Sequence, residues 1–254
     1  MSGAQIRISW LAPDVVKIAR QALSARASSW GEHFRGGFDA GPAPAAIEPE
    51  DWPAIAEHLA RAEHVSEVIR DRGIEAALAQ FEGSPHAVEL ATLATAAAYV
   101  DAVELDLVAA LLERPIDPYI AYGGYLELLT SLGDEQPERT LAIYERFADA
   151  FSATRTQQPM WVERVAVVQS GLAGFYVKCR RFDAADAIYS KRHAQEPTTL
   201  IVALGASRTF LAAGALSHAI DWLGHGAERA RKLARPDMAT RLEAKQASLR
   251  ARQQ

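Results

Sequence analysis

The chain has 254 residues, of which 49% are hydrophobic and 23% are charged, so it can bury a sizeable core and has an ordinary soluble composition. Its formal net charge of −5 provides no overall attraction to nucleic acid, and we do not expect a nucleic-acid partner. The single cysteine, Cys179, excludes an internal disulfide framework and suits a reducing compartment.

The sequence shows neither a secretory signal nor a membrane span. Residues 1–10 contain one arginine, and no long apolar run precedes Pro13. The longest uncharged apolar run near the middle, residues 90–100, lies between Glu89 and Asp101 and is too short to cross a bilayer. We therefore expect a cytoplasmic protein without membrane contact.

The first two predicted regions are residues 1–50 and 51–116. The first combines an N-terminal helix with a loop rich in glycine, alanine and proline. The second is helical, with a proline at position 53 in its first turn and a break at Gly73. We expect helices over residues 13–26, 51–71, 74–81 and 86–113, the last with a break near Val100.

The third region, residues 117–254, is predicted to hold helical repeats and a C-terminal capping helix. A helix beginning at Asp117 is expected to stop at Gly133, and Pro137 is expected to start its partner, which runs to about Ala153. This pair has the pattern of a degenerate repeat. A polar helix over residues 237–250 would cover the apolar face of the last repeat.

Two copies of one helix-turn-helix unit lie between Ala166 and Lys232, offset by 34 residues. Small and aromatic residues recur at this offset, which is typical of stacked helical repeats. The matching pairs are Ala173 and Ser207, Tyr176 and Phe210, Ala185 and Ala219, and Tyr189 and Leu223. Asp183 and Ser217 are expected to cap the second helix of each copy. We expect Ala185 and Ala219 to permit close helix crossings.

This pattern resembles the tetratricopeptide repeat family, with Pro197 at the family's closing proline position. The chain departs from the family where Gln169 and Ala203 replace a favoured tryptophan, and where Arg192 and Gly226 replace a small alanine. The resemblance implies an all-α fold in which antiparallel helix pairs stack as a short right-handed superhelix, an α-solenoid. It also implies an adaptor or scaffold that binds a protein or peptide partner on its concave surface.

The family's groove positions fall on the first helix of each copy. They are mostly apolar, and two of them are cations. In this chain they are Val167, Ser170, Gly174, Val177, Lys178, Ile201, Leu204, Arg208, Leu211 and Ala212. Some family members hold a C-terminal carboxylate with a clamp that includes asparagine, and this chain has no asparagine. Carboxylate binding by Lys178 and Arg208 stays open.

An aromatic stripe is a further candidate site. Tyr119, Tyr122 and Tyr125 recur every three residues around two glycines. They fit either the packing of a helix against its neighbours or an aromatic wall for a partner, because tyrosine is favoured at interfaces. We include Tyr119 and Tyr122 among the partner-binding candidates.

The histidine clusters predict no metal site. His218, Asp221 and His225 share one helical face and have ligand chemistry, but a solvated polar face accounts for them. Glu63, His64 and Glu67 have the wrong order for a di-iron motif, so we expect a charged outer face. The common phosphate-binding, metalloprotease, hydrolase and dinucleotide motifs are missing from the sequence. We expect a non-catalytic protein without cofactor.

Charge is distributed unevenly along the chain. Residues 228–252 contain eight lysines or arginines and three acidic residues, a local excess of five positive charges. This basic end fits a solubilising cap or a contact with an anionic partner. Two alternatives to the adaptor stay open. One is a self-associating scaffold that forms a homo-oligomer, and the other is an enzyme or small-ligand binder with its site in the N-terminal half.

Overall fold

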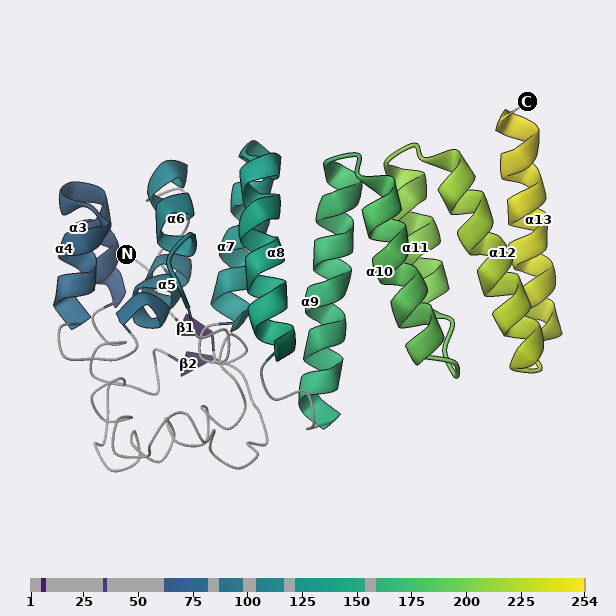
Figure 1. Cartoon of the computed structure of the whole chain (residues 1–254), viewed down its shortest axis with the longest axis horizontal. Helices are drawn as coiled ribbons and strands as arrows, with labels where there is room; N and C mark the ends of the chain where they lie inside the picture. Colours follow the sequence, from purple (N-terminus) through teal and green to yellow (C-terminus); the bar gives the residue numbers. More distant parts are fainter. Residues whose placement is uncertain are drawn as a thin grey trace. The chain divides into compact units, whose positions relative to one another are not determined.

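The computed structural model in Figure 1 describes residues 6–7, 34–35, 62–81, 87–97, 104–116, 122–153 and 159–253. By its internal contacts the chain divides into two compact units, residues 1–154 and 155–254. Apart from one pair of two-residue strands, every regular element in these described ranges is a helix. The predicted helical class is therefore confirmed. The contact-based division assigns residues 117–153 to the first unit, whereas the sequence pattern groups them with the later repeats.

The first unit contains a minimal parallel strand pair and a series of helices. Strand β1 (Ile6–Arg7) pairs with β2 (Phe34–Arg35). The helical elements are α3 (Ala62–Arg72), α4 (Ile74–Leu78), the 3-10 turn η4 (Ala79–Phe81), α5 (Ala87–Ala97), α6 (Leu105–Leu112), α7 (Tyr122–Glu135) and α8 (Pro137–Ala153). Gly73, with φ of 81°, separates α3 from α4 as the sequence predicts. The expected helices over residues 13–26 and 51–61 lie outside the described residues.

The predicted helix end at Gly133 is wrong, whereas the predicted start at Pro137 is confirmed. Helix α7 continues through Gly133 to Glu135, and Gln136 alone separates it from α8. Gly133 is buried, so it is a packing residue inside the helix. The Gln136 carbonyl accepts the amide of Thr140, which lets α8 begin at once.

The core of the first unit is built from apolar side chains of α5, α6, α7 and α8. Leu90, Leu93 and Leu128 are fully buried. Gly124 of α7 permits close packing on α5, because a Cβ at this position would lie 3.2 Å from the Leu93 side chain. On the surface, Arg139 of α8 bonds to Glu113 at 2.7 Å, which lowers the pKa of that carboxyl.

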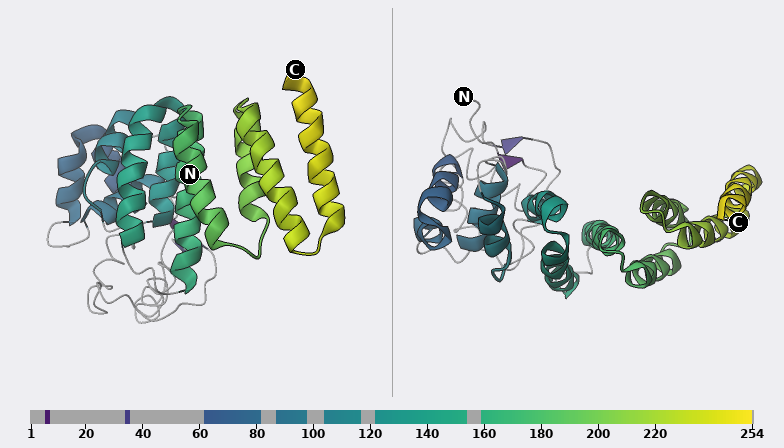
Figure 2. Two further views of the ribbon diagram at one scale, coloured as in Figure 1. Left: turned by 45° about the vertical axis from the view of Figure 1, so that its right-hand side comes forward. Right: turned by 90° about the horizontal axis from the view of Figure 1, so that it is seen from above.

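The second unit is a row of five helices in its described residues. They are α9 (Pro159–Lys178), α10 (Phe182–Gln195), α11 (Ile201–Ala212), α12 (Leu216–Lys232) and α13 (Pro236–Gln253). Figure 2 shows each of them beside the next, and the pairs α9–α10, α11–α12 and α12–α13 pack most extensively. Within the described ranges, the structure contains no helix that combines the length and the apolar character of a membrane span.

The 34-residue offset recurs in the backbone of this unit. After α9 the amide of Arg181 donates to the Tyr176 carbonyl at 2.8 Å, and after α11 the amide of Ala215 donates to the Phe210 carbonyl at 2.9 Å. Such six-residue closures require a left-handed residue just past the helix. Gly214 supplies it in the second copy with φ of 73°, whereas Arg180 adopts φ of 58° in the first.

The predicted caps at Asp183 and Ser217 are wrong by two residues. The N-cap residues are Arg181 and Ala215, and neither makes a side-chain capping bond. The tight turn explains the shift, because the residue that closes the first helix also begins the next one. Asp183 instead lies in the first turn of α10, where its charge favours the helix dipole.

The core of the second unit contains the residues that repeat in the sequence. Ala185 and Ala219 are fully buried, and Tyr189 and Leu223 are nearly so. Trp222 is 1% exposed, and its Nε1 donates to the Asp186 carboxylate at 2.7 Å. Small residues at these positions therefore bring neighbouring helices together, and aromatic side chains fill the space beside them.

Candidate functional site: a groove between helices 9 and 11

A groove of about 430 Å³ lies between α9 and α11, over α10. It contains three of the predicted site residues, Val167, Ser170 and Ile201. Val167 is 59% exposed and Ile201 72% exposed, which is unusual for large apolar side chains. The remaining lining residues are Ala166, Tyr189, Arg192, Glu196, Val202, Gly205 and Thr209. Exposed apolar side chains around a hollow favour a binding surface.

A second hollow, of about 350 Å³, continues along the same two helices. Four more of the predicted residues line it, namely Gly174, Val177, Lys178 and Ala212. Thr209 lines both hollows, so they form one surface, which we call the α9–α11 groove. The ammonium of Lys178 lies 6.0 Å from the centre of the Phe175 ring.

Not all the predicted residues reach this groove. Leu204 and Leu211 lie outside both hollows and pack instead against the apolar cluster formed by α12 and α13. The exposed stripe of α11 runs through Ile201, Gly205, Arg208 and Ala212, at steps of four, three and four residues. Because a helix turns by 100° per residue, these exposed residues lie within about 40° of Ile201 around the helix axis, whereas Leu204 and Leu211 lie about 60° and 80° away from it. Arg208 lies on the stripe and is exposed, but like the two leucines it lines neither hollow.

Of the three tyrosines in the predicted aromatic stripe, the structure describes the side chain of Tyr125. Tyr119 and the side chain of Tyr122 lie outside the described residues. Tyr125 is a core residue, 2% exposed, with its ring stacked on Phe147 at 4.4 Å between centres. Its hydroxyl donates to the Leu112 carbonyl, and burial raises its pKa above the ordinary tyrosine value.

Arg192 forms the charged floor of the groove. It is only 7% exposed, yet its guanidinium bonds to the Glu196 carboxylate at 2.6 Å and also to the Ser170 hydroxyl. Its Nε has no hydrogen-bond partner among the described residues. Because burying a charge is costly unless it is paired, the ion pair with Glu196 permits an arginine at this depth. The sequence marks Arg192 only as a departure from a small residue.

The groove also holds a buried phenol. The Tyr189 hydroxyl lies 3.4 Å from the Thr209 hydroxyl, and burial raises the pKa of Tyr189. The phenol is therefore neutral at physiological pH and offers a hydrogen bond without charge. Because Glu196 compensates the charge of Arg192, the floor of the groove is polar with little net charge, and the rim of the groove is apolar.

No protein-family model, curated protein or solved structure matches this chain. Its function must therefore be inferred from the surfaces themselves.

The histidine cluster predicted on α12 does not converge. The ring of His218 stacks on Phe210 at 4.9 Å, and its Nε2 lies 3.8 Å from the carboxylate of Asp183. His225 lies instead 6.0 Å from His193 of α10, measured between ring centres. Within the described ranges, no three histidine, cysteine, aspartate or glutamate side chains gather in a way that suits a metal ion.

Cys179 and Glu67 belong to no site on the described surface. Cys179 is partly buried in the turn after α9, in line with a structural role. Glu67 is exposed on α3, whereas the side chains of its neighbours Glu63 and His64 lie outside the described part. His193 and Arg192 are the functional candidates that sequence reasoning missed, because their neighbours come from other helices.

Proposed function

We propose that the second unit is a protein-interaction module that binds a segment of a partner polypeptide in the α9–α11 groove. The proposal includes its architecture, a short tetratricopeptide-like superhelix of stacked helix pairs, and an adaptor role in the cytoplasm. The observation that carries it is the pair of exposed apolar residues, Val167 and Ile201, that line the α9–α11 groove. The matching turns after α9 and α11 support the repeat architecture.

The chemistry of the groove indicates the character of its partner. Apolar side chains of the partner would cover Val167 and Ile201, and each Å² removed from water contributes about 25 cal/mol before the costs of association. Arg208 and Lys178 would orient an acidic group of the partner, but exposed ion pairs contribute only about 0–1 kcal/mol. We therefore propose a segment with apolar anchors and one acidic residue, bound mainly through its apolar contacts.

The experiment begins with affinity capture of partners from native lysate and identification by mass spectrometry. A captured partner is then titrated against Ile201→Glu, Arg208→Ala and the control Ala187→Glu, which places the same charge on an exposed position of α10. We expect Ile201→Glu to weaken binding most, Arg208→Ala to have a modest effect that added salt reduces, and the control to match the parent.

Two results would contradict this assignment. In the first, a partner binds equally well to Ile201→Glu and to the parent. In the second, only the chain itself is captured, and sedimentation shows a dimer that Ile201→Glu leaves intact. The second result would favour the self-associating scaffold and would place its interface outside the α9–α11 groove.

A further inference from the structure

A separate pocket of about 330 Å³ lies between α10 and α12. Its lining comes from these two neighbouring helices alone and is rich in imidazole and cationic side chains. The aromatic and charged lining residues are His193, Trp222, His225, Glu228, Arg229 and Lys232. None of them lines either hollow of the α9–α11 groove. The volume lies at the small end of the range for ligand pockets, which suits a small molecule and not a polypeptide.

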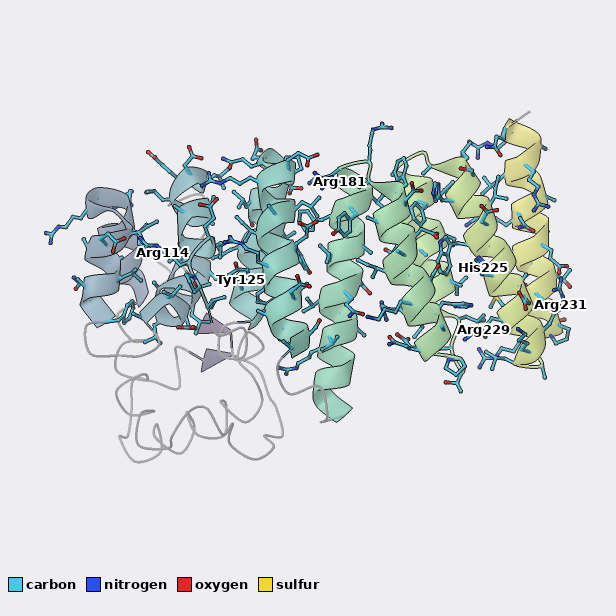
Figure 3. The ribbon with its side chains drawn as sticks, in the orientation of Figure 1. Arg114, Tyr125, Arg181, His225, Arg229 and Arg231 are labelled. Atoms are coloured by element: carbon cyan, nitrogen blue, oxygen red, sulfur yellow. The ribbon has the colours of Figure 1, made fainter. Side chains whose placement is uncertain are left out.

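Three aromatic rings form one wall of this pocket. The His193 ring stands perpendicular to Trp222 at 5.6 Å between centres, and the His225 ring lies 5.2 Å from Trp222. The hydrogen bond from Trp222 to Asp186 fixes the indole in the core. Figure 3 shows His225 and Arg229 one turn apart on α12. The wall is therefore rigid at Trp222, and the exposed ring of His225 forms its outer edge.

Positive charge exceeds negative charge in the pocket. Lys232 pairs with Glu228 at 2.7 Å, which leaves Arg229 as the uncompensated cation. Arg229 donates to the backbone carbonyls of Glu196 at 2.6 Å and His193 at 2.9 Å. It has no carboxylate within ion-pair distance among the described residues. A guanidinium has five N–H groups, so three remain after these two bonds.

The surroundings of His193 favour its neutral form. Burial and the charge of Arg229 lower its pKa, with smaller contributions from His225 and Lys232 that outweigh the opposing effect of Glu228. Its Nδ1 is buried and has no hydrogen-bond partner in the described structure. An anion placed beside these rings would reverse this electrostatic effect, because an opposite charge within about 4–6 Å favours the protonated form.

We propose that the α10–α12 pocket binds a small ligand through an oxyanion, a carboxylate or a sulfate-like group, held by Arg229 and His225 against the Trp222 wall. The ligand compensates Arg229, and it is bound more tightly as the pH falls and His193 gains a proton. A transition metal is the less suitable occupant, because no third ligand joins His193 and His225 among the described residues, where Glu228 is paired with Lys232.

The test uses benzoate and sulfate, which keep their charge between about pH 5.5 and 7.5, the range in which histidine titrates. Histidine ring resonances of the full chain are followed by NMR during each titration, and affinity is measured at both ends of this range. We expect saturating ligand to raise the pKa of His193 by about one unit, which corresponds to a dissociation constant about tenfold lower when this ring is protonated. Preference for benzoate over sulfate would assign the site to carboxylates, and the reverse preference would assign it to doubly charged anions.

Two matched variants locate the effect. His225→Gln removes an exposed ring of the pocket, whereas His218→Gln removes a histidine of the same helix outside it. Only His225→Gln should weaken binding. The dissociation constant should rise about tenfold, which corresponds to the loss of one charge-assisted contact of about 1.4 kcal/mol. Arg229→Gln should weaken binding further, and a thermal melt checks that α10 stays folded without this arginine. The proposal is overturned if neither probe shifts the His193 and His225 resonances, or if sodium chloride produces the same shifts.

Discussion

Replacing Ala185 by leucine should destabilise the second unit, because the alanine lies where α10 packs closely on its neighbours. Ala185 has no exposed surface and belongs to the same core cluster as Ala173 of α9 and Tyr189. If the site had room, three added carbons would stabilise the fold by about 2 kcal/mol through burial. Because the site is already filled, overpacking should instead cost about 1–3 kcal/mol.

The matched control is Ala187→Leu, two residues further along the same helix and exposed to solvent. Leucine and alanine have similar helix propensities, so the control should change stability by less than about 0.5 kcal/mol. For a unit of this size, 1 kcal/mol corresponds to a shift of about 4–8 °C in Tm. Thermal melts followed by circular dichroism should show Ala185→Leu well below both the parent and the control.

A melting temperature for Ala185→Leu at or above that of Ala187→Leu would refute the close crossing. Ala219→Leu tests the repeat itself, since Ala219 is equally buried 34 residues later. A loss for one variant and none for the other would show that the two copies are not equivalent in packing.

Three further predictions concern charge and metal. In a urea titration, Glu196→Gln should lower the free energy of unfolding by about 1–3 kcal/mol, because it leaves Arg192 buried without its carboxylate partner. The control Glu243→Gln breaks the exposed ion pair with Arg231 and should lower this free energy by less than about 1 kcal/mol. Stability should fall as the pH falls below about 6.5, because the pKa of His193 is lowered in the folded state and the unfolded chain therefore protonates this ring first. His193→Gln should reduce this dependence of Tm on pH. An unchanged dependence would contradict the prediction. Zinc added to the full chain should show no stoichiometric binding at His218, Asp221 and His225; retention after dialysis that His218→Ala abolishes would contradict this.

Some local signals in the sequence predicted the local structure, whereas the predicted caps and the predicted stop at Gly133 did not. Gly73 and Pro137 mark element boundaries because their backbone constraints act on their own position. The 34-residue offset also identified Ala185 and Ala219 as core residues, because helices that cross closely need small side chains at the contact. Gly133 was misread because a glycine that stops a helix and one that packs inside it look alike in a single sequence.

The site was less predictable because it depends on contacts between helices. The family's groove positions include Val167 and Ile201, which line the α9–α11 groove, but also Leu204 and Leu211, which pack on α12 and α13 instead. The floor of the groove depends on Arg192 meeting Ser170 across 22 residues, and the second pocket depends on His193 meeting His225 across 32. Spacing along one helix cannot reveal such pairs, because only the packing of two helices decides which faces meet.

The order of contacts in the second unit has a kinetic consequence. Its most extensive contacts join helices that are neighbours in the chain, and α13 packs chiefly on α12. Structures dominated by short-range contacts fold quickly and open in parts, so amide hydrogens should exchange through local fraying as well as global unfolding. Protection should therefore be lowest in α13 and rise toward α11 and α12, and a ligand that bridges α10 and α12 would slow exchange in both helices while leaving the end of α13 unchanged.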